Sequence, residues 1–163
     1  MTLDDLGWNE FNLGILGATA ALAGLVIVAA SVNIAEIVKS RSLTARLAAG
    51  IATLVLAITA SALALFPEIT FVAYGAAVLV SALIAMVFNA HAARAITQDT
   101  DPQNRFKVPR AAINFLPAAI YAVGSAMLIA GEPAGLVVVA VGAIVAIPVA
   151  LLISWIVLVE VLR

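Results

Sequence analysis

Cysteine is absent from this 163-residue chain, and histidine occurs only once, as His91. Without cysteine the chain has no disulfide, no thiolate nucleophile, no iron–sulfur cluster and no cysteine-ligated zinc site. A single histidine cannot supply the several converging ligands that a metal or a bis-histidine haem requires. We therefore expect no bound metal and no cofactor.

Charged residues are also scarce. They make up 10% of the chain, against about 25% in an average soluble domain. The net charge is −1 and the basic residues form no long run, so nucleic acid is not an expected partner. No long apolar stretch carries Asp, Glu, Lys, Arg or His near its middle, where proton relays and voltage sensors need such a residue. Phosphate-binding loops, nucleophile elbows and zinc-protease motifs are missing too, so the sequence predicts no catalytic residues and no enzyme.

Apolar residues are in excess, at 65% of the chain, and the mean hydropathy is +1.20. One small globular core cannot hide so many apolar side chains, so the lipid bilayer must be their solvent. A helix needs ~20 apolar residues to cross the hydrocarbon layer. Five stretches of this length predict an all-α integral membrane protein, a bundle of five transmembrane helices in a single domain over residues 1–163. The predicted spans are roughly 13–35, 47–66, 69–90, 111–131 and 134–159.

Polar and turn-forming residues separate the predicted spans. Phe66-Pro67-Glu68 and Gly131-Glu132-Pro133 predict tight turns, because proline removes a backbone donor and glycine permits a positive φ. The segment EIVKSRSLTAR predicts the first connection, and residues 91–110 predict a polar loop before the fourth span. Pro117 and Pro148 fall inside the last two spans, where proline can kink a helix.

The basic residues predict how the chain is oriented in the membrane. Five spans place all eight on one side, and they place the acidic N-terminus and the two tight turns on the other side. Because basic loops stay in the cytoplasm, we expect the N-terminus outside, the C-terminus inside and a cytoplasmic loop at 91–110. The eight residues are Lys39, Arg41, Arg46, Arg94, Arg105, Lys107, Arg110 and Arg163.

Small residues line one face of the first span, at alternating steps of three and four residues. We name this set the small-residue row. It consists of Gly14, Gly17, Ala21, Gly24, Val28 and Ser31. Small residues allow close approach between helices in lipid, so the row is typical of a packing seam. The alternative is a pore lining in a symmetric oligomer, although such a pore also needs a ring of polar or acidic groups.

Polar residues near the ends of the spans form two further candidate sets. Asn33 and Asn89 are predicted to lie in a polar interior, with Asn89 bonded to a neighbouring helix or to backbone. The second set is an interfacial charge cluster, predicted to pair acids with bases and to fix the depth of the helices, or to dock a partner. It consists of Glu36, Arg46, Arg94, Arg110 and Glu160.

Several segments carry a resemblance to known proteins. They are ALAGLVIVAASVNIAEIV in the first span, Arg46 after it, Leu65-Phe66-Pro67 at the end of the second span, and the C-terminal WIVLVEVLR. The chain resembles a family of small bacterial five-span membrane proteins, many of which are labelled modulators of the FtsH membrane protease. The resemblance covers most of the chain and implies a regulator in the bacterial inner (cytoplasmic) membrane. ALAGLVIVAASV is also similar to the pore helix of Orai calcium channels, with Val32 in place of the glutamate of the Orai filter.

Three functional hypotheses follow. The first is a non-enzymatic accessory or regulatory subunit that packs against another membrane protein, as the small-residue row and the interfacial charge cluster indicate. The second is self-association into a homo-oligomeric ion channel whose first span lines the pore. The third is an enzyme that acts on lipid, for which only Glu36, His91 and Glu160 are available at the interface.

Overall fold

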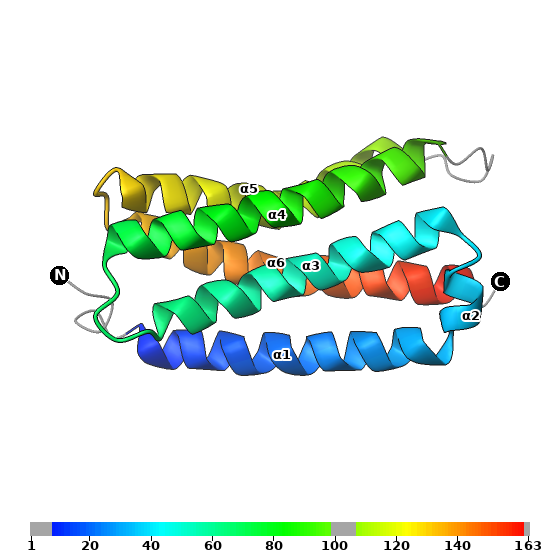
Figure 1. Ribbon diagram of the computed structural model, residues 1–163, viewed down its shortest axis with the longest axis horizontal. Coiled ribbons are helices and arrows are strands. Elements are labelled where there is room, and N and C mark those ends of the chain that lie inside the picture. The colour runs from blue at the N-terminus through cyan, green and yellow to red at the C-terminus, as the bar shows by residue number, and fades with distance from the viewer. Residues whose placement is uncertain (1–7, 99–106, 162–163) are drawn as a thin grey trace.

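The computed structural model describes residues 8–98 and 107–161, which form six α-helices (Figure 1). They are α1 (Asn9–Val32), α2 (Ile34–Ile37), α3 (Arg41–Ala64), α4 (Phe71–Gln98), α5 (Lys107–Ile129) and α6 (Gly135–Val161). All but the four-residue α2 are long and apolar enough to cross a membrane. The prediction of five helices long and apolar enough to span a membrane is therefore confirmed, and the fold fits a polytopic membrane protein.

The helices extend beyond the spans expected from hydropathy. α4 continues to Gln98 and α5 begins at Lys107, so both run through much of the segment predicted as a polar loop. The reason is helix propensity, since HAARAITQ is rich in alanine and contains neither glycine nor proline. At 1.5 Å per residue, a helix of the length of α4 measures about 42 Å, longer than the ~30 Å hydrocarbon layer. Hydropathy therefore marks where a helix crosses lipid and not where it ends.

The first predicted span is divided at its end. α1 stops at Val32 and the short α2 follows, with Asn33 between them. Asn33 donates its Nδ2–H to the Ala29 carbonyl at 3.1 Å, a local bond that competes with helix continuation. Ser40 then caps α3 by accepting from the Leu43 backbone N–H at 3.3 Å. These polar bonds turn the chain back into the bundle.

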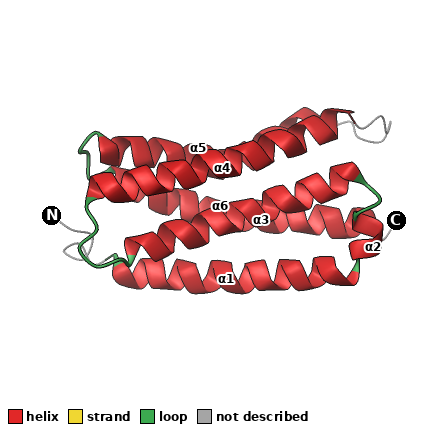
Figure 2. Ribbon diagram, in the orientation of Figure 1, coloured by secondary structure: helices red, strands yellow, loops and turns green. Residues whose placement is uncertain are grey.

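Successive long helices run antiparallel to one another (Figures 1 and 2). In the view of Figure 1, α4 and α5 lie at the top, α3 and α6 in the middle and α1 at the bottom. α3 packs against α1, α4 and α6, and α5 packs against α4 and α6. α1 is the peripheral member: it packs on α3 and, less extensively, on α6.

Glycines mark the places where the central helices approach most closely. A Cβ added to Gly75 of α4 would lie 2.9 Å from the Ser125 carbonyl oxygen of α5. A Cβ added to Gly135 of α6 would lie 2.6 Å from the carbonyl oxygen of Gly124 in α5. A Cβ at either position would force neighbouring atoms to shift, and its absence lets the backbones approach closely, as membrane helices require in the absence of a strong hydrophobic force.

The two tight turns lie at the same end of the bundle as the N-terminus of α1 (Figure 1). Glu68 adopts a positive φ of 56° and Gly131 a φ of 85°, which reverse the chain between consecutive helices. We name this end the acidic end, because its described charges are carboxylates. They are Glu10, Glu68 and Glu132. The opposite end, the basic end, holds the bases of α3 and α4.

Candidate functional site

The small-residue row lies on the outer surface of α1. All six of its residues are exposed, whereas the opposite face of the helix is buried against α3 and α6. The buried residues are Asn12, Thr19, Ala23, Val26 and Ala30. The row is therefore not a packing seam against any helix that the structure describes. Among the described residues nothing covers it, and it lies where lipid or another protein would contact the helix.

The glycines of the row differ from those of the central helices. A Cβ added to Gly14, Gly17 or Gly24 would meet no atom of the described residues within 4 Å. A Cβ added to Gly142 of α6 would instead touch the ring of Tyr121 at 3.1 Å. In α3 to α6, glycine thus serves close helix packing, whereas in α1 it leaves a shallow strip with no neighbour in the described part of the chain.

The chemistry of this face is almost entirely apolar. Large side chains flank the row and are also exposed, including Leu13, Leu25 and Ile27. The single hydroxyl in the row, that of Ser31, donates to the carbonyl of Val28 in the same helix at 2.7 Å. A partner would therefore recognise this face by its apolar surface and its shape, without charged or reactive groups. A strip of small residues between larger ones forms a groove that can accept a ridge of side chains from another helix.

Two members of the interfacial charge cluster form an ion pair at the basic end. Arg46 of α3 donates from Nη1 to Oε2 of Glu160 in α6 at 2.6 Å. The guanidinium is almost fully buried, at 5% exposure for the residue, while the Glu160 side chain keeps 34%. The pair joins helices far apart in sequence and fixes the last turns of α6 against α3.

Of the remaining members, Glu36 and Arg94 lie apart from this pair in the described part of the chain. Glu36 pairs with Lys39 at 2.6 Å, and both side chains are well exposed. Arg94 is exposed near the end of α4. The side chain of Arg110 lies outside those that the structure describes. The cluster of five expected from sequence is therefore represented, in the described part of the chain, by one interhelical pair and separate surface charges.

The interior of the bundle contains more polar groups than the sequence pattern predicted. Asn89 is fully buried, and neither of its amide atoms has a hydrogen-bond partner among the described residues, whereas Asn33 is only half-buried. Asn114, Tyr121 and Ser125 are also buried, and all lie on α5. Their spacing of seven and four residues places them on one face of the helix. This spacing in the sequence could have predicted a buried polar face on α5. It does not show in a pattern of small and charged residues alone.

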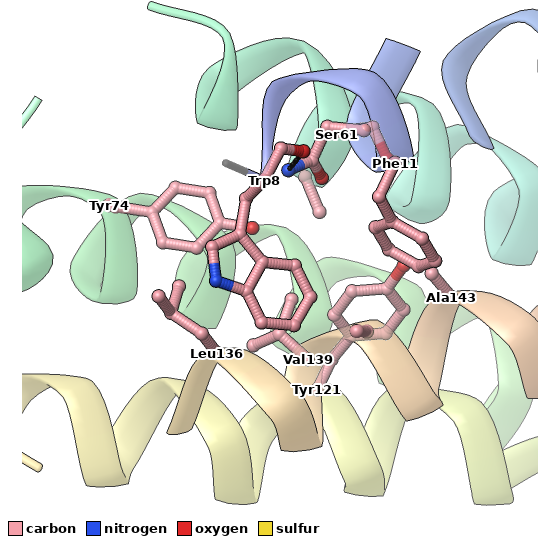
Figure 3. Close-up of a pocket in the computed structure, with 11 residues that line it drawn as sticks. Trp8, Phe11, Ser61, Tyr74, Tyr121, Leu136, Val139 and Ala143 are labelled. Atoms are coloured by element: carbon pink, nitrogen blue, oxygen red, sulfur yellow. Dashed lines mark hydrogen bonds between the residues drawn. The ribbon is translucent and has the colours of Figure 1, made fainter. Parts of the chain in front are cut away.

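A small pocket opens among the helices at the acidic end (Figure 3). Trp8 and Phe11 reach it from the start of α1, and Tyr74 and Tyr121 reach it from α4 and α5. Figure 3 shows the two tyrosine rings on either side of the indole of Trp8. The indole and the Phe11 ring meet edge to face, with centroids 5.8 Å apart. The free space is about that of one water molecule.

Reactive groups are sparse in the part of the chain that the structure describes. No three side chains of His, Cys, Asp or Glu gather there in a group that could hold a metal ion. His91 is exposed, and its Nδ1 lies 3.1 Å from the Val87 carbonyl oxygen of the same helix. The described residues therefore offer buried surface and hydrogen bonds, and no group of ligands for a metal ion.

Comparison with known proteins gives no relative for this chain: no protein-family model, no curated protein and no solved structure matches it. The function must therefore be inferred from the molecule itself.

Proposed function

We propose that this protein is a non-enzymatic accessory subunit that docks on another membrane protein through the small-residue row of α1. One observation carries the proposal. Three glycines of α1 lie on an exposed face, and a Cβ added to any of them would meet no described atom within 4 Å, while glycines in the central helices fill close helix contacts. The same residue type serves interhelical approach elsewhere in this chain, which supports the same use on α1.

The energetic cost of these glycines favours the same function. Glycine in a helix costs roughly 0.5–1 kcal/mol relative to alanine, because glycine loses more backbone freedom. For Gly14, Gly17 and Gly24 no contact within the described part of the chain offsets this cost. Close approach of a partner helix offsets it through dispersion contacts and weak backbone hydrogen bonds.

The channel alternative lacks a comparable observation. A pore lined by α1 would present Gly, Ala and Val side chains and the hydroxyl of Ser31, which already donates within its own helix. Selectivity and conduction need rings of carbonyl, charged or other polar groups aimed at the axis. The exposed face of α1 between residues 14 and 31 has no charged residue.

The charge distribution supports an orientation for the proposed subunit. The bases Lys39, Arg41 and Arg94 lie at one end of the bundle, and the described carboxylates at the other end have no base among them. By the positive-inside rule we place the basic end in the cytoplasm of a bacterial inner membrane. A membrane protease, the partner implied by the resemblance described above, is one protein that such a subunit would regulate.

Site-directed cross-linking tests the proposal. The chain has no cysteine, so Val28→Cys and Val80→Cys each introduce a single thiol. The two valines are matched controls, since Val28 in the row is 62% exposed and Val80 on α4 is 58% exposed. With a photoreactive thiol reagent in native membranes, we expect one protein adduct at position 28 and lipid adducts at position 80. Lipid adducts at both positions, or an adduct between two copies at position 28, would contradict the proposal.

A further inference from the structure

The pocket at the acidic end brings together polar atoms from four different helices. Tyr121 of α5 is fully buried, and its hydroxyl has no hydrogen-bond partner among the described residues. Tyr74 of α4 and Ser61 of α3 line the same pocket and add two more hydroxyl groups. Asn12 of α1 donates its Nδ2–H to the Trp8 carbonyl at 2.9 Å, so its carboxamide oxygen is the acceptor that remains. The pocket thus gathers both donors and acceptors around one small space.

An unpartnered hydroxyl in this position is costly. A buried donor or acceptor without a partner gives up its hydrogen bonds to water and gains none in return, which lowers the stability of the fold. Tyr121 has no exposed surface, and Trp8 and Phe11 line the same pocket (Figure 3). The group that satisfies Tyr121 must therefore sit inside the pocket.

The size of the pocket restricts its occupant. The free space accommodates about one water-sized molecule, too little for a lipid headgroup or an organic ligand. None of the described side chains that line the pocket is charged, so a bound ion would have no counter-charge. We propose that the pocket is a specific binding site for a single ordered water, held by the hydroxyl of Tyr121 and by polar atoms of Tyr74, Ser61 and Asn12.

The site has a structural consequence for α1. This helix packs on α3 and less extensively on α6, so its links to α4 and α5 run through the pocket at its N-terminal end. A water that bonds to Asn12 and to the tyrosines joins the peripheral helix to the α4–α5 pair. It thereby fixes the rotation of α1, which decides the face that α1 turns outward. The water site does not depend on a partner that docks on the small-residue row.

Solid-state NMR of the full chain in liposomes tests the site directly. The chain has two tyrosines, so ¹³C-tyrosine labelling gives two sets of ring signals, which Tyr74→Phe assigns. In a water-edited spectrum we expect a strong early transfer from bound water to Tyr121. Absence of transfer to Tyr121 would overturn the proposal. A shift of the Tyr121 signals on adding millimolar ammonium chloride would show a cation in the pocket and would overturn it too.

Thermal unfolding gives an independent test, because a dry and a hydrated pocket predict opposite signs. In a hydrated pocket Tyr121→Phe removes a hydrogen bond, and the midpoint falls by roughly 2–4 °C. In a dry pocket the same change removes an unpartnered hydroxyl, and the midpoint rises. Ser125→Ala is the matched control: Ser125 lies one turn away on α5, buried and without a described partner but not lining the pocket, so its midpoint should stay or rise. A rise for Tyr121→Phe would overturn the proposal.

Discussion

The ion pair at the basic end predicts an asymmetric response to mutation. Glu160→Gln leaves the guanidinium of Arg46 buried at 5% exposure without a counter-charge. Arg46→Met leaves the carboxylate of Glu160, which already keeps a third of its side-chain surface exposed and can turn toward water. Methionine also preserves much of the aliphatic packing of the arginine stem. We therefore expect the loss of the acid to be more harmful than the loss of the base.

The magnitudes follow from burial. Removing one partner of a fully buried pair costs about 3–5 kcal/mol. Because Glu160 is partly exposed, its attraction to Arg46 is partly screened, and we expect Glu160→Gln to lower the free energy of unfolding by about 3 kcal/mol. Arg46→Met should cost about 1 kcal/mol, and the double variant about the same, since no charge is then left buried. The double-mutant cycle should therefore give a coupling energy of about 3 kcal/mol.

Reversible unfolding in mixed micelles, followed by tryptophan fluorescence, measures these differences. Lys39→Met is the matched control, because the Lys39–Glu36 pair has the same 2.6 Å separation but is well exposed on both sides. It should cost less than about 0.5 kcal/mol. Equal losses for Glu160→Gln and Arg46→Met, or a coupling energy near that of the exposed pair, would refute the reasoning from burial.

The remaining predictions concern glycines and the buried amide. Gly135→Ala should lower the free energy of unfolding by about 1–3 kcal/mol, because the new Cβ would lie 2.6 Å from a carbonyl oxygen of α5. Gly17→Ala should leave the free energy of unfolding unchanged or raise it by up to about 1 kcal/mol, since that Cβ meets no described atom within 4 Å. A loss of stability like that of Gly135→Ala would contradict the exposure of the small-residue row. Asn89→Leu should raise the free energy of unfolding by about 1 kcal/mol by removing two polar atoms that have no partner among the described residues, and a decrease in the same assay would show that the amide has a partner.

The sequence predicts the number of spanning helices well because bilayer thickness and backbone hydrogen bonding leave few options. A run of about 20 apolar residues in lipid must be helical, so hydropathy alone locates the five long helices. Outside the hydrocarbon layer this constraint disappears, and helix propensity decides where an element ends. Helix propensity outside the hydrocarbon layer therefore explains why α4 extends to Gln98 and why α5 already begins at Lys107.

The candidate sites were less predictable, because periodicity shows that residues share a face but not what that face contacts. The row on α1 and the glycines of α5 and α6 look alike in sequence, yet Gly17 is open and Gly124 is 2.9 Å from the backbone of α6 when a Cβ is added. Ion pairs between helices are equally hard to predict from sequence, since Arg46 and Glu160 are 114 residues apart. Only the packing order of the helices brings them together.

The central claim is that the small-residue row docks a different membrane protein. Native mass spectrometry of the protein extracted gently from its own membranes, at natural abundance, tests this claim most directly, with Gly17→Leu as the comparison. We predict a complex with a larger, different membrane protein for the wild type and its loss in Gly17→Leu. The fold of the variant should be preserved, because position 17 is exposed and a Cβ added there meets no described atom within 4 Å. A monomer or a complex of identical copies for the wild type, or a hetero-complex that persists in the variant, would contradict it.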